Sequence, residues 1–222
     1  MVKSKRKNLY VCLYIFSSLL ILAQVVWSFF SISPFERIGI TLFASTALYI
    51  GALAEISFKG KDLEKKIMQR NFYVLFAYFL LLFFALVFLD SYFGDSRSDI
   101  SKIGKELNLI PFKTSASLIY GTSKGWVAPE KPLINIVGNL VICMPFALFL
   151  PLLFKKLRKF INFLIVISIG ILIVELMQVV SARGVCDIDD LIFNVGGAAI
   201  AFVILHIKPL RKVVQNFTKL EY

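Results

Sequence analysis

Polar side chains recur at helical spacing in three otherwise apolar stretches of the second half of the chain. Asn135 and Asn139 are four residues apart, and Glu175 and Gln178 are three apart, so each pair lies on one face of a helix. An ionisable side chain at the centre of a membrane span costs about 2.5–3.5 kcal/mol, which makes such residues functional candidates by default. The candidate set comprises Asn135, Asn139, Glu175, Gln178, Asp187, Asp190 and Asn194.

Three of these side chains are expected at similar depth. With a helical rise of about 1.5 Å per residue, Glu175 lies roughly 7 Å, Asn139 roughly 6 Å and Asn194 roughly 9 Å above the membrane midplane, all on the outer side. Polar groups within a bilayer are most stable when they face one another. The sequence therefore predicts one polar layer beneath the outer surface, with a rim formed by Arg183, Asp187 and Asp190.

Several kinds of chemistry fit this set. Arg183 could bind an anionic group, and Glu175 could accept a hydrogen bond or carry a proton. Asp187, Asp190 and Glu175 could instead hold Mg²⁺ against a lipid phosphate, because this ion prefers oxygen ligands. A plainer interpretation makes Asp187 the N-cap of the last span and assigns the asparagines to hydrogen bonds between helices.

Long apolar segments must position these residues. Of the 222 residues, 58% are hydrophobic and only 18% are charged, and the mean hydropathy is +0.79. This composition is too apolar for one soluble core. Only helices and closed barrels span membranes, and the apolar runs do not alternate, so we expect an all-α polytopic membrane helix bundle. Six transmembrane helices are predicted over 9–30, 38–58, 71–89, 133–154, 160–180 and 190–207.

The net charge of +11 is concentrated in alternate loops. Seventeen of the 25 Lys and Arg residues lie in the N-terminal segment, in the loops after the second and fourth spans, and in the tail. Because Lys and Arg favour the cytoplasmic side, both termini are expected in the cytoplasm. Short basic runs between spans argue against a nucleic-acid module. Three scattered cysteines predict neither a disulfide framework nor a metal site, and no cofactor is expected.

One long loop, 90–132, is expected on the outer face. Apolar residues recur at i, i+3 and i+7 after Ser98, which predicts a short amphipathic helix over 99–107 on the membrane surface. Segment 109–112 is apolar and is expected to dip back onto the bundle. A second short helix is predicted over 114–120.

Motifs from three parts of the chain resemble, in order and spacing, those of the VanZ-like family of bacterial membrane proteins. They are Asn108-Leu-Ile-Pro-Phe112, then Asn135-x-x-Gly138-Asn139 with Pro145-Phe146 and Leu150-Pro151, then Glu175-x-x-Gln178 with Arg183, Asp187, Asp190 and Asn194-x-x-Gly197. The likeness covers roughly 75–205, and Ala147 departs from it where glycine is common. The resemblance adds Asn108 to the candidate site. It implies a two-helix extension at 1–70 with a cytoplasmic basic loop, a VanZ-like membrane domain at 71–210 and a cytoplasmic tail at 211–222.

The resemblance also implies a function. The founding member of the family is associated with low-level resistance to teicoplanin, a lipid-bearing glycopeptide, and acts without the altered peptidoglycan terminus. We therefore expect a cell-envelope membrane protein with an outward-facing polar pocket for an amphiphile. The ligand could be a lipid-linked wall precursor, a lipid headgroup or a lipoglycopeptide. Membrane lipids are expected partners, and the oligomeric state stays open.

Three other functions stay open. A membrane enzyme acting on a lipid phosphate would use the carboxylates, but no nucleophile–histidine pair is present and His206 is expected at the opposite end of its span. No catalytic residue is therefore named. An ion-coupled transporter would use Glu175 as its carrier, but the six spans show no matched halves. In a purely structural subunit, the polar layer would only fix helix packing.

Overall fold

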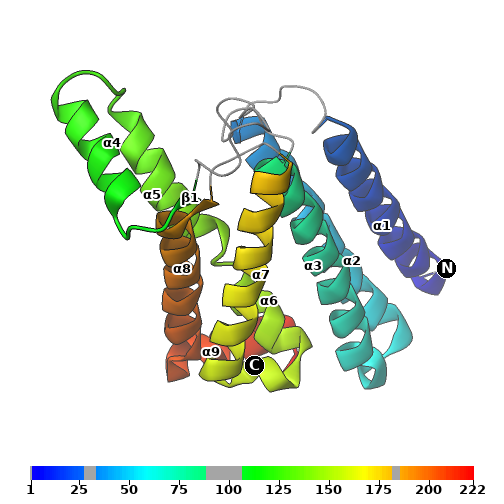
Figure 1. Cartoon of the computed structure of the whole chain (residues 1–222). Coiled ribbons are helices and arrows are strands. Elements are labelled where there is room, and N and C mark those ends of the chain that lie inside the picture. Colours follow the sequence, from blue (N-terminus) through cyan, green and yellow to red (C-terminus); the bar gives the residue numbers. More distant parts are fainter. Residues whose placement is uncertain (1, 28–33, 89–106, 182–185) are drawn as a thin grey trace. The chain divides into compact units, whose positions relative to one another are not determined.

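The computed structural model describes residues 2–27, 34–88, 107–181 and 186–222 (Figure 1). Within these residues, six helices are long and apolar enough to cross a membrane. They are Lys7–Val26, Glu36–Lys59, Lys61–Phe88, Glu130–Leu153, Phe160–Val180 and Ile188–His206. The predicted all-α architecture with six spans is confirmed, and the chain is a multi-pass membrane protein. Which side of the membrane each loop faces stays a prediction.

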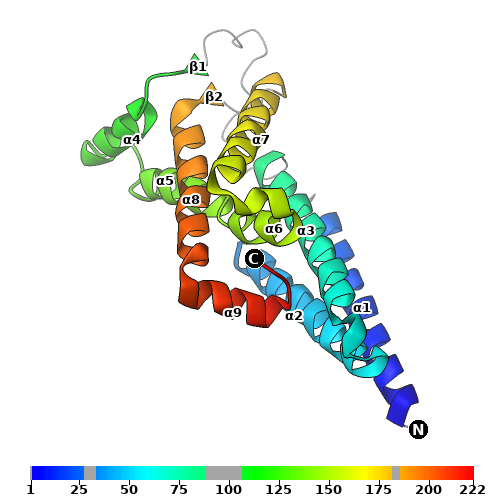
Figure 2. The same ribbon diagram turned by 90° about the horizontal axis from the view of Figure 1, so that it is seen from below.

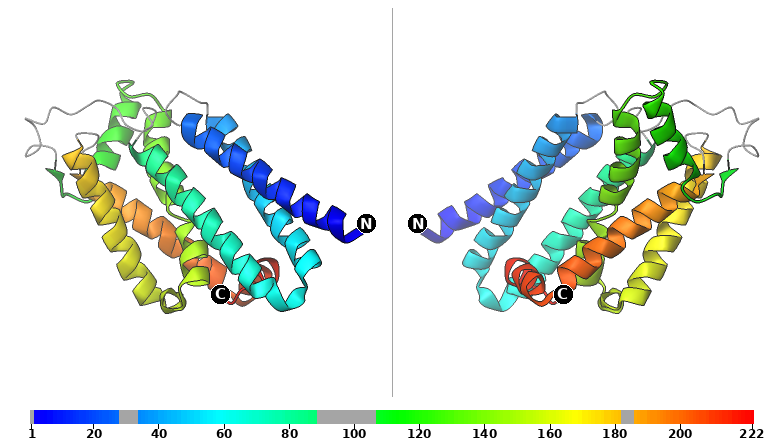
Figure 3. Two further views of the ribbon diagram at one scale, coloured as in Figure 1. Left: turned by 90° about the vertical axis from the view of Figure 1, so that its right-hand side faces the viewer. Right: turned by 90° about the vertical axis from the view of Figure 1, so that its left-hand side faces the viewer.

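The first compact unit comprises the N-terminal helices and the short segment Gln215–Glu221. Its helices are α1 (Val2–Trp27), α2 (Pro34–Lys59), the 3₁₀ helix η1 (Lys61–Leu63) and α3 (Glu64–Phe88). Helix α1 packs along α2, as both views of Figure 3 show. Ala44 of α2 lies in a buried cluster with Tyr78 and Leu82 of α3, so apolar packing joins the helices of this unit.

A buried carboxylate ties the three helices of this unit together. The Glu55 side chain is 2% exposed and accepts hydrogen bonds from the Tyr14 hydroxyl at 2.8 Å and from Lys59 Nζ at 2.8 Å. Arg70 of α3 also forms an ion pair with Glu55. Two cations and a hydroxyl offset the cost of burying this charge. Gln24 is likewise fully buried and hydrogen-bonded, whereas the buried side-chain amide of Asn71 on α3 has no hydrogen-bond partner among the described residues.

The second compact unit contains both strands and the remaining helices, with the last helix included only as far as Val214. In chain order the elements are β1 (Leu107–Asn108), α4 (Lys113–Ser123), α5 (Glu130–Ile142), α6 (Phe146–Leu153), the 3₁₀ helix η3 (Lys155–Arg158), α7 (Phe160–Val180), β2 (Cys186–Asp187), α8 (Ile188–His206) and α9 (Lys208–Thr218). Helix α8 packs against both α5 and α7. Figure 2 shows α9 leaving the end of α8 in a new direction.

The structure tests one of the two helices predicted in the loop before α5. Residues 99–106 of the predicted surface helix lie outside the described residues, and Leu107 belongs to strand β1. The helix predicted over 114–120 is present as α4, which extends to Ser123.

The fourth span consists of two helices. Pro145 has no backbone N–H to donate, so the α-helical ladder cannot continue through it. Helix α5 ends at Ile142, the Met144 amide bonds the Val141 carbonyl in a tighter turn, and α6 begins after Pro145. The span is thus broken at Pro145, and the break separates the polar α5 from the apolar α6.

A second proline in this span is compensated by the last residue of the sequence. Pro151 lies inside α6 and cannot donate to the carbonyl of Ala147, four residues earlier. The hydroxyl of Tyr222 donates to that carbonyl instead. Tyr222 is fully buried and packs against the His206 ring, with centroids 4.6 Å apart. Residues outside the predicted spans therefore complete a membrane helix of this unit.

Candidate functional site

A ladder of polar contacts joins α5 to α8. Asn135 and Asn139 lie one turn apart on α5, and both Nδ2 atoms donate to Oδ1 of Asp190 on α8, the first at 3.5 Å. One turn further along each helix, Cys143 Sγ lies 3.2 Å from Oδ1 of Asn194. The i, i+4 spacing on both helices keeps these contacts in register. The predicted convergence of these asparagines with Asp190 and Asn194 is therefore present.

Close approach of the two helices depends on Gly197, one turn beyond Asn194. A Cβ atom at this position would lie 1.8 Å from the backbone oxygen of Leu140 on α5. The neighbouring Gly196 has nothing within 4 Å of such an atom. The Asn194-x-x-Gly197 motif thus combines an amide that bonds across the helix pair with a residue small enough to permit the contact.

Glu175 brings α7 to the same group. Its side chain is 4% exposed, and the Asp187 backbone amide and the carboxylates of Asp187 and Asp190 lie around it. Within the described residues, its Oε2 atom has no hydrogen-bond partner. Gln178, one turn away on α7, is half-buried. The expected depth of Glu175 in the membrane predicted that it would lie with the polar residues of α5 and α8. In the structure, the Asp190 carboxylate of α8 is among its neighbours.

Asp187 anchors the long loop to the start of α8. Strands β1 and β2 pair in parallel, with Asn108 opposite Asp187. Nδ2 of Asn108 donates to Oδ1 of Asp187 at 3.0 Å, and the same carboxylate caps α8 by accepting from the Asp189 amide at 3.0 Å. The capping interpretation of Asp187 is confirmed. Asn108, which only the family resemblance added to the set, is joined to it.

Asp189 is absent from the predicted set, yet it has the most complete hydrogen bonding in this region. The residue is fully buried, and its carboxylate accepts from the Phe112 amide, from the Ser115 amide at 2.9 Å and from the Ser115 hydroxyl at 2.8 Å. It thereby caps the N-terminus of α4. Segment 109–112 does return to the start of α8 through its backbone, although the Leu109 side chain is 67% exposed.

Arg183 lies outside the described residues, so its role at the rim stays a prediction. Across the described ranges, no group of three or more His, Cys, Asp and Glu side chains is arranged to hold a metal ion. That finding gives no support to a Mg²⁺ site at Glu175, Asp187 and Asp190.

Burial, and then the carboxylates of Glu175, Asp187 and Asp190, raise the pKa of the Cys186 thiol.

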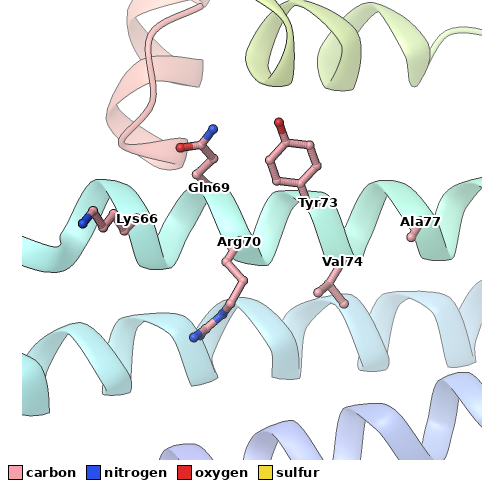
Figure 4. A pocket seen from close by; sticks show the side chains of 6 residues that line it. All are labelled: Lys66, Gln69, Arg70, Tyr73, Val74 and Ala77. Carbon is pink, nitrogen blue, oxygen red and sulfur yellow. The ribbon is translucent and has the colours of Figure 1, made fainter.

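A surface hollow occurs in the other unit, on α3 (Figure 4). Its volume is about 470 Å³, and its lining residues are Lys66, Gln69, Arg70, Tyr73, Val74 and Ala77. The sequence predicted no site here. Arg70 already pairs with Glu55, which leaves Lys66 as the cation without a described ion pair among the lining residues.

Residues 72–209 match the family model described as VanZ/LLP1. The chain belongs to the VanZ/LLP1 family. The match includes α5, α7 and α8, so the whole polar cluster lies within the VanZ/LLP1 region, whereas α1 and α2 lie outside it. No curated protein and no solved structure is significantly similar to the chain. The resemblance predicted from the motifs is thereby confirmed.

Proposed function

We propose that this VanZ-like protein acts at the cell envelope by binding an amphiphile at the polar cluster of α5, α7 and α8. The observation that supports the proposal most directly is the buried Glu175 carboxyl, whose Oε2 atom is without a partner among the described residues. A buried polar atom without a partner costs about 1–3 kcal/mol, and a purely structural cluster gains nothing from keeping one. A bound ligand would satisfy it.

The surroundings of Glu175 favour a ligand that carries an apolar portion. Leu176, Met177 and Val180 of α7 are exposed close to it along the helix, with Val180 at 78%. Such a surface faces lipid or an acyl chain more readily than water. An amphiphile would place its polar head at the cluster and its apolar part along α7. A lipid-linked wall precursor, a lipid headgroup or a lipoglycopeptide satisfies this description, and the cluster is proposed to face outward.

The test is teicoplanin susceptibility in a Gram-positive host that carries the wild-type gene, an empty vector or a variant. Glu175→Gln removes the unpaired carboxylate with little change in shape. Glu130→Gln is the matched control, because Glu130 is an exposed carboxylate in the same unit. We expect wild type and Glu130→Gln to raise the minimum inhibitory concentration several-fold and Glu175→Gln to lose that effect at equal protein level.

Two results would contradict the proposal. Equal susceptibility of wild-type and empty-vector cells would remove the link to glycopeptides. Undiminished binding of every amphiphile tested by purified Glu175→Gln protein would show that the cluster is not the binding site. Metal-dependent release of phosphate from a lipid by the wild-type protein would favour the enzyme alternative instead.

A further inference from the structure

Among its described residues, the polar cluster has oxygen acceptors without partners, whereas the Nδ2 donors of its asparagines are all used. Within this cluster, two buried oxygens lack partners among the described residues, Oε2 of Glu175 and Oδ1 of Asn135. Both lie near Asp190, since Nδ2 of Asn135 donates to Asp190 and the Asp190 carboxylate acts on Glu175 through space. The unsatisfied atoms are thus oxygens of one small group of side chains.

The asparagine donors around these oxygens are already used. Nδ2 of Asn135 and of Asn139 both bond Asp190 Oδ1. Nδ2 of Asn194 donates to the Asp190 backbone oxygen at 2.8 Å, and Asn108 Nδ2 is held by Asp187. A ligand that only accepts hydrogen bonds, such as a phosphate or a carboxylate, would therefore face carboxylates and find no free asparagine donor.

From this imbalance we infer that the ligand presents a primary ammonium group to Glu175 and Asn135. An ammonium carries three N–H donors and one positive charge, so one such group has donors enough for both oxygens and a charge opposite to that of the surrounding carboxylates. A sugar hydroxyl could donate but brings no positive charge, whereas an ammonium would also offset the carboxylates of this cluster. The inference rests on the proposed function, because it specifies the headgroup chemistry of the same amphiphile.

A primary ammonium could come from two sources in the envelope. One is an aminophospholipid headgroup, and the other is the amine of a peptide or sugar attached to a wall precursor or lipoglycopeptide. The chemistry at Glu175 is the same for both. The sources differ in whether the amine is joined to a diacylglycerol phosphate.

The experiment measures thermal stabilisation and affinity of the purified full-length protein in detergent on addition of defined probes. Phosphatidylethanolamine supplies the ammonium on a phospholipid. Phosphatidylcholine has the same charge but no N–H donor, and phosphatidylglycerol has no amine. Dodecylamine supplies the ammonium without a phosphate. Each probe is tested on wild type, Glu175→Gln, Asn135→Leu and the control Glu130→Gln.

We expect phosphatidylethanolamine to bind wild type and Glu130→Gln roughly tenfold or more tightly than phosphatidylcholine, because a charge-assisted hydrogen bond distinguishes them. Glu175→Gln and Asn135→Leu should each lose most of this preference. Dodecylamine binding that depends on Glu175 would show that the amine suffices, and its failure would assign the site to the phospholipid source.

Equal binding of phosphatidylethanolamine and phosphatidylcholine by wild type would overturn the inference. If phosphatidylglycerol bound instead in a manner that depended on Glu175, the ammonium inference would fail while the proposed amphiphile site survived. If no probe showed any dependence on Glu175 or Asn135, both would fail. A variant that does not fold is recognised by its melting profile. If either Glu175→Gln or Asn135→Leu fails to fold, the other variant is compared with wild type.

Discussion

Three carboxylates at the start of α8 bind three different parts of the chain. Asp187 holds β1 through Asn108, Asp189 caps α4, and Asp190 binds the asparagines of α5. The alternation of direction follows from the chain leaving β2 and entering α8, which turns each successive side chain by about 100°. The residues that hold the fold and those that could face a ligand are therefore neighbours in sequence, and only their partners distinguish them.

Sequence reasoning found most of this cluster and missed its most buried acid. Helical spacing and depth predict that Asn139, Asn194 and Glu175 lie together, because both depend only on the regular rise and turn of helices. Asp189 lies off that face. Its partners, Phe112 and Ser115, come from a loop whose path no periodicity predicts. The one signal for Asp189 in the sequence was its place as an acidic residue in the first turn of the helix that became α8.

The pKa of the Cys186 thiol depends on the charge of the polar cluster. Because burial and then the Glu175 carboxylate raise the pKa of its thiol, the reactive thiolate is scarcer at neutral pH than for an ordinary cysteine. We expect the rate of maleimide labelling in a Cys12→Ser, Cys143→Ala background to keep rising with pH beyond the usual thiol range of about 8.5. Glu175→Gln should lower the pKa of Cys186 and speed labelling at pH 7.5.

Glu130→Gln is again the control for that measurement and should leave the labelling profile unchanged. A profile that is identical in wild type and Glu175→Gln would mean that the Glu175 carboxylate does not act on Cys186.

At the scale of elements, Gly197 sets the distance between α5 and α8. Because a Cβ there would overlap a backbone oxygen and not a flexible side chain, Gly197→Ala must push the helices apart. We expect a loss of at least about 1–3 kcal/mol of stability, measured as a lower melting temperature in detergent. Gly196→Ala, with open space around it, should be neutral or slightly stabilising, since alanine favours helix more than glycine does. Equal melting temperatures for both variants would refute the close contact.

Tyr222 completes α6 by replacing the hydrogen bond that Pro151 cannot make. Burial raises the pKa of its phenol, so the hydroxyl stays protonated and can donate throughout the neutral range. We expect Tyr222→Phe to cost about 1–3 kcal/mol, because the Ala147 carbonyl would then be buried without a partner. The exposed Tyr120 provides the control, and Tyr120→Phe should leave the unfolding transition where it is in wild type.

The elements themselves were largely predictable from sequence, and the reason is physical. Backbone groups in lipid must bond within their own helix, so a long apolar run is nearly sufficient to define a span. The pairing of β1 with β2 was not predicted, because each strand is two residues long and its partner is distant in the sequence. Nor was the role of Tyr222, since nothing in a local pattern joins it to Ala147.

At the scale of the whole molecule, the distribution of Lys and Arg predicts that both termini lie in the cytoplasm. In a background that lacks Cys12, Cys143 and Cys186, a membrane-impermeant thiol reagent should then label Lys124→Cys, in the loop between α4 and α5, on intact cells. The matched variant Lys61→Cys, in η1, should react only after the membrane is opened. Both positions are exposed, so access to the reagent differs only by the side of the membrane. Labelling of Lys61→Cys but not of Lys124→Cys on intact cells would show the opposite orientation, with the polar cluster toward the cytoplasm.

The contact between Asn108 and Asp187 also fixes an order of events during synthesis. These residues are 79 positions apart, and β1 cannot pair with β2 until β2 and the start of α8 have left the ribosome. The asparagines of α5 are likewise synthesised before Asp190, which binds them and follows 55 and 51 positions later. A nascent chain halted before α8 therefore exposes unpaired amides within the bilayer, which is the feature that membrane quality-control proteases and chaperones would encounter first.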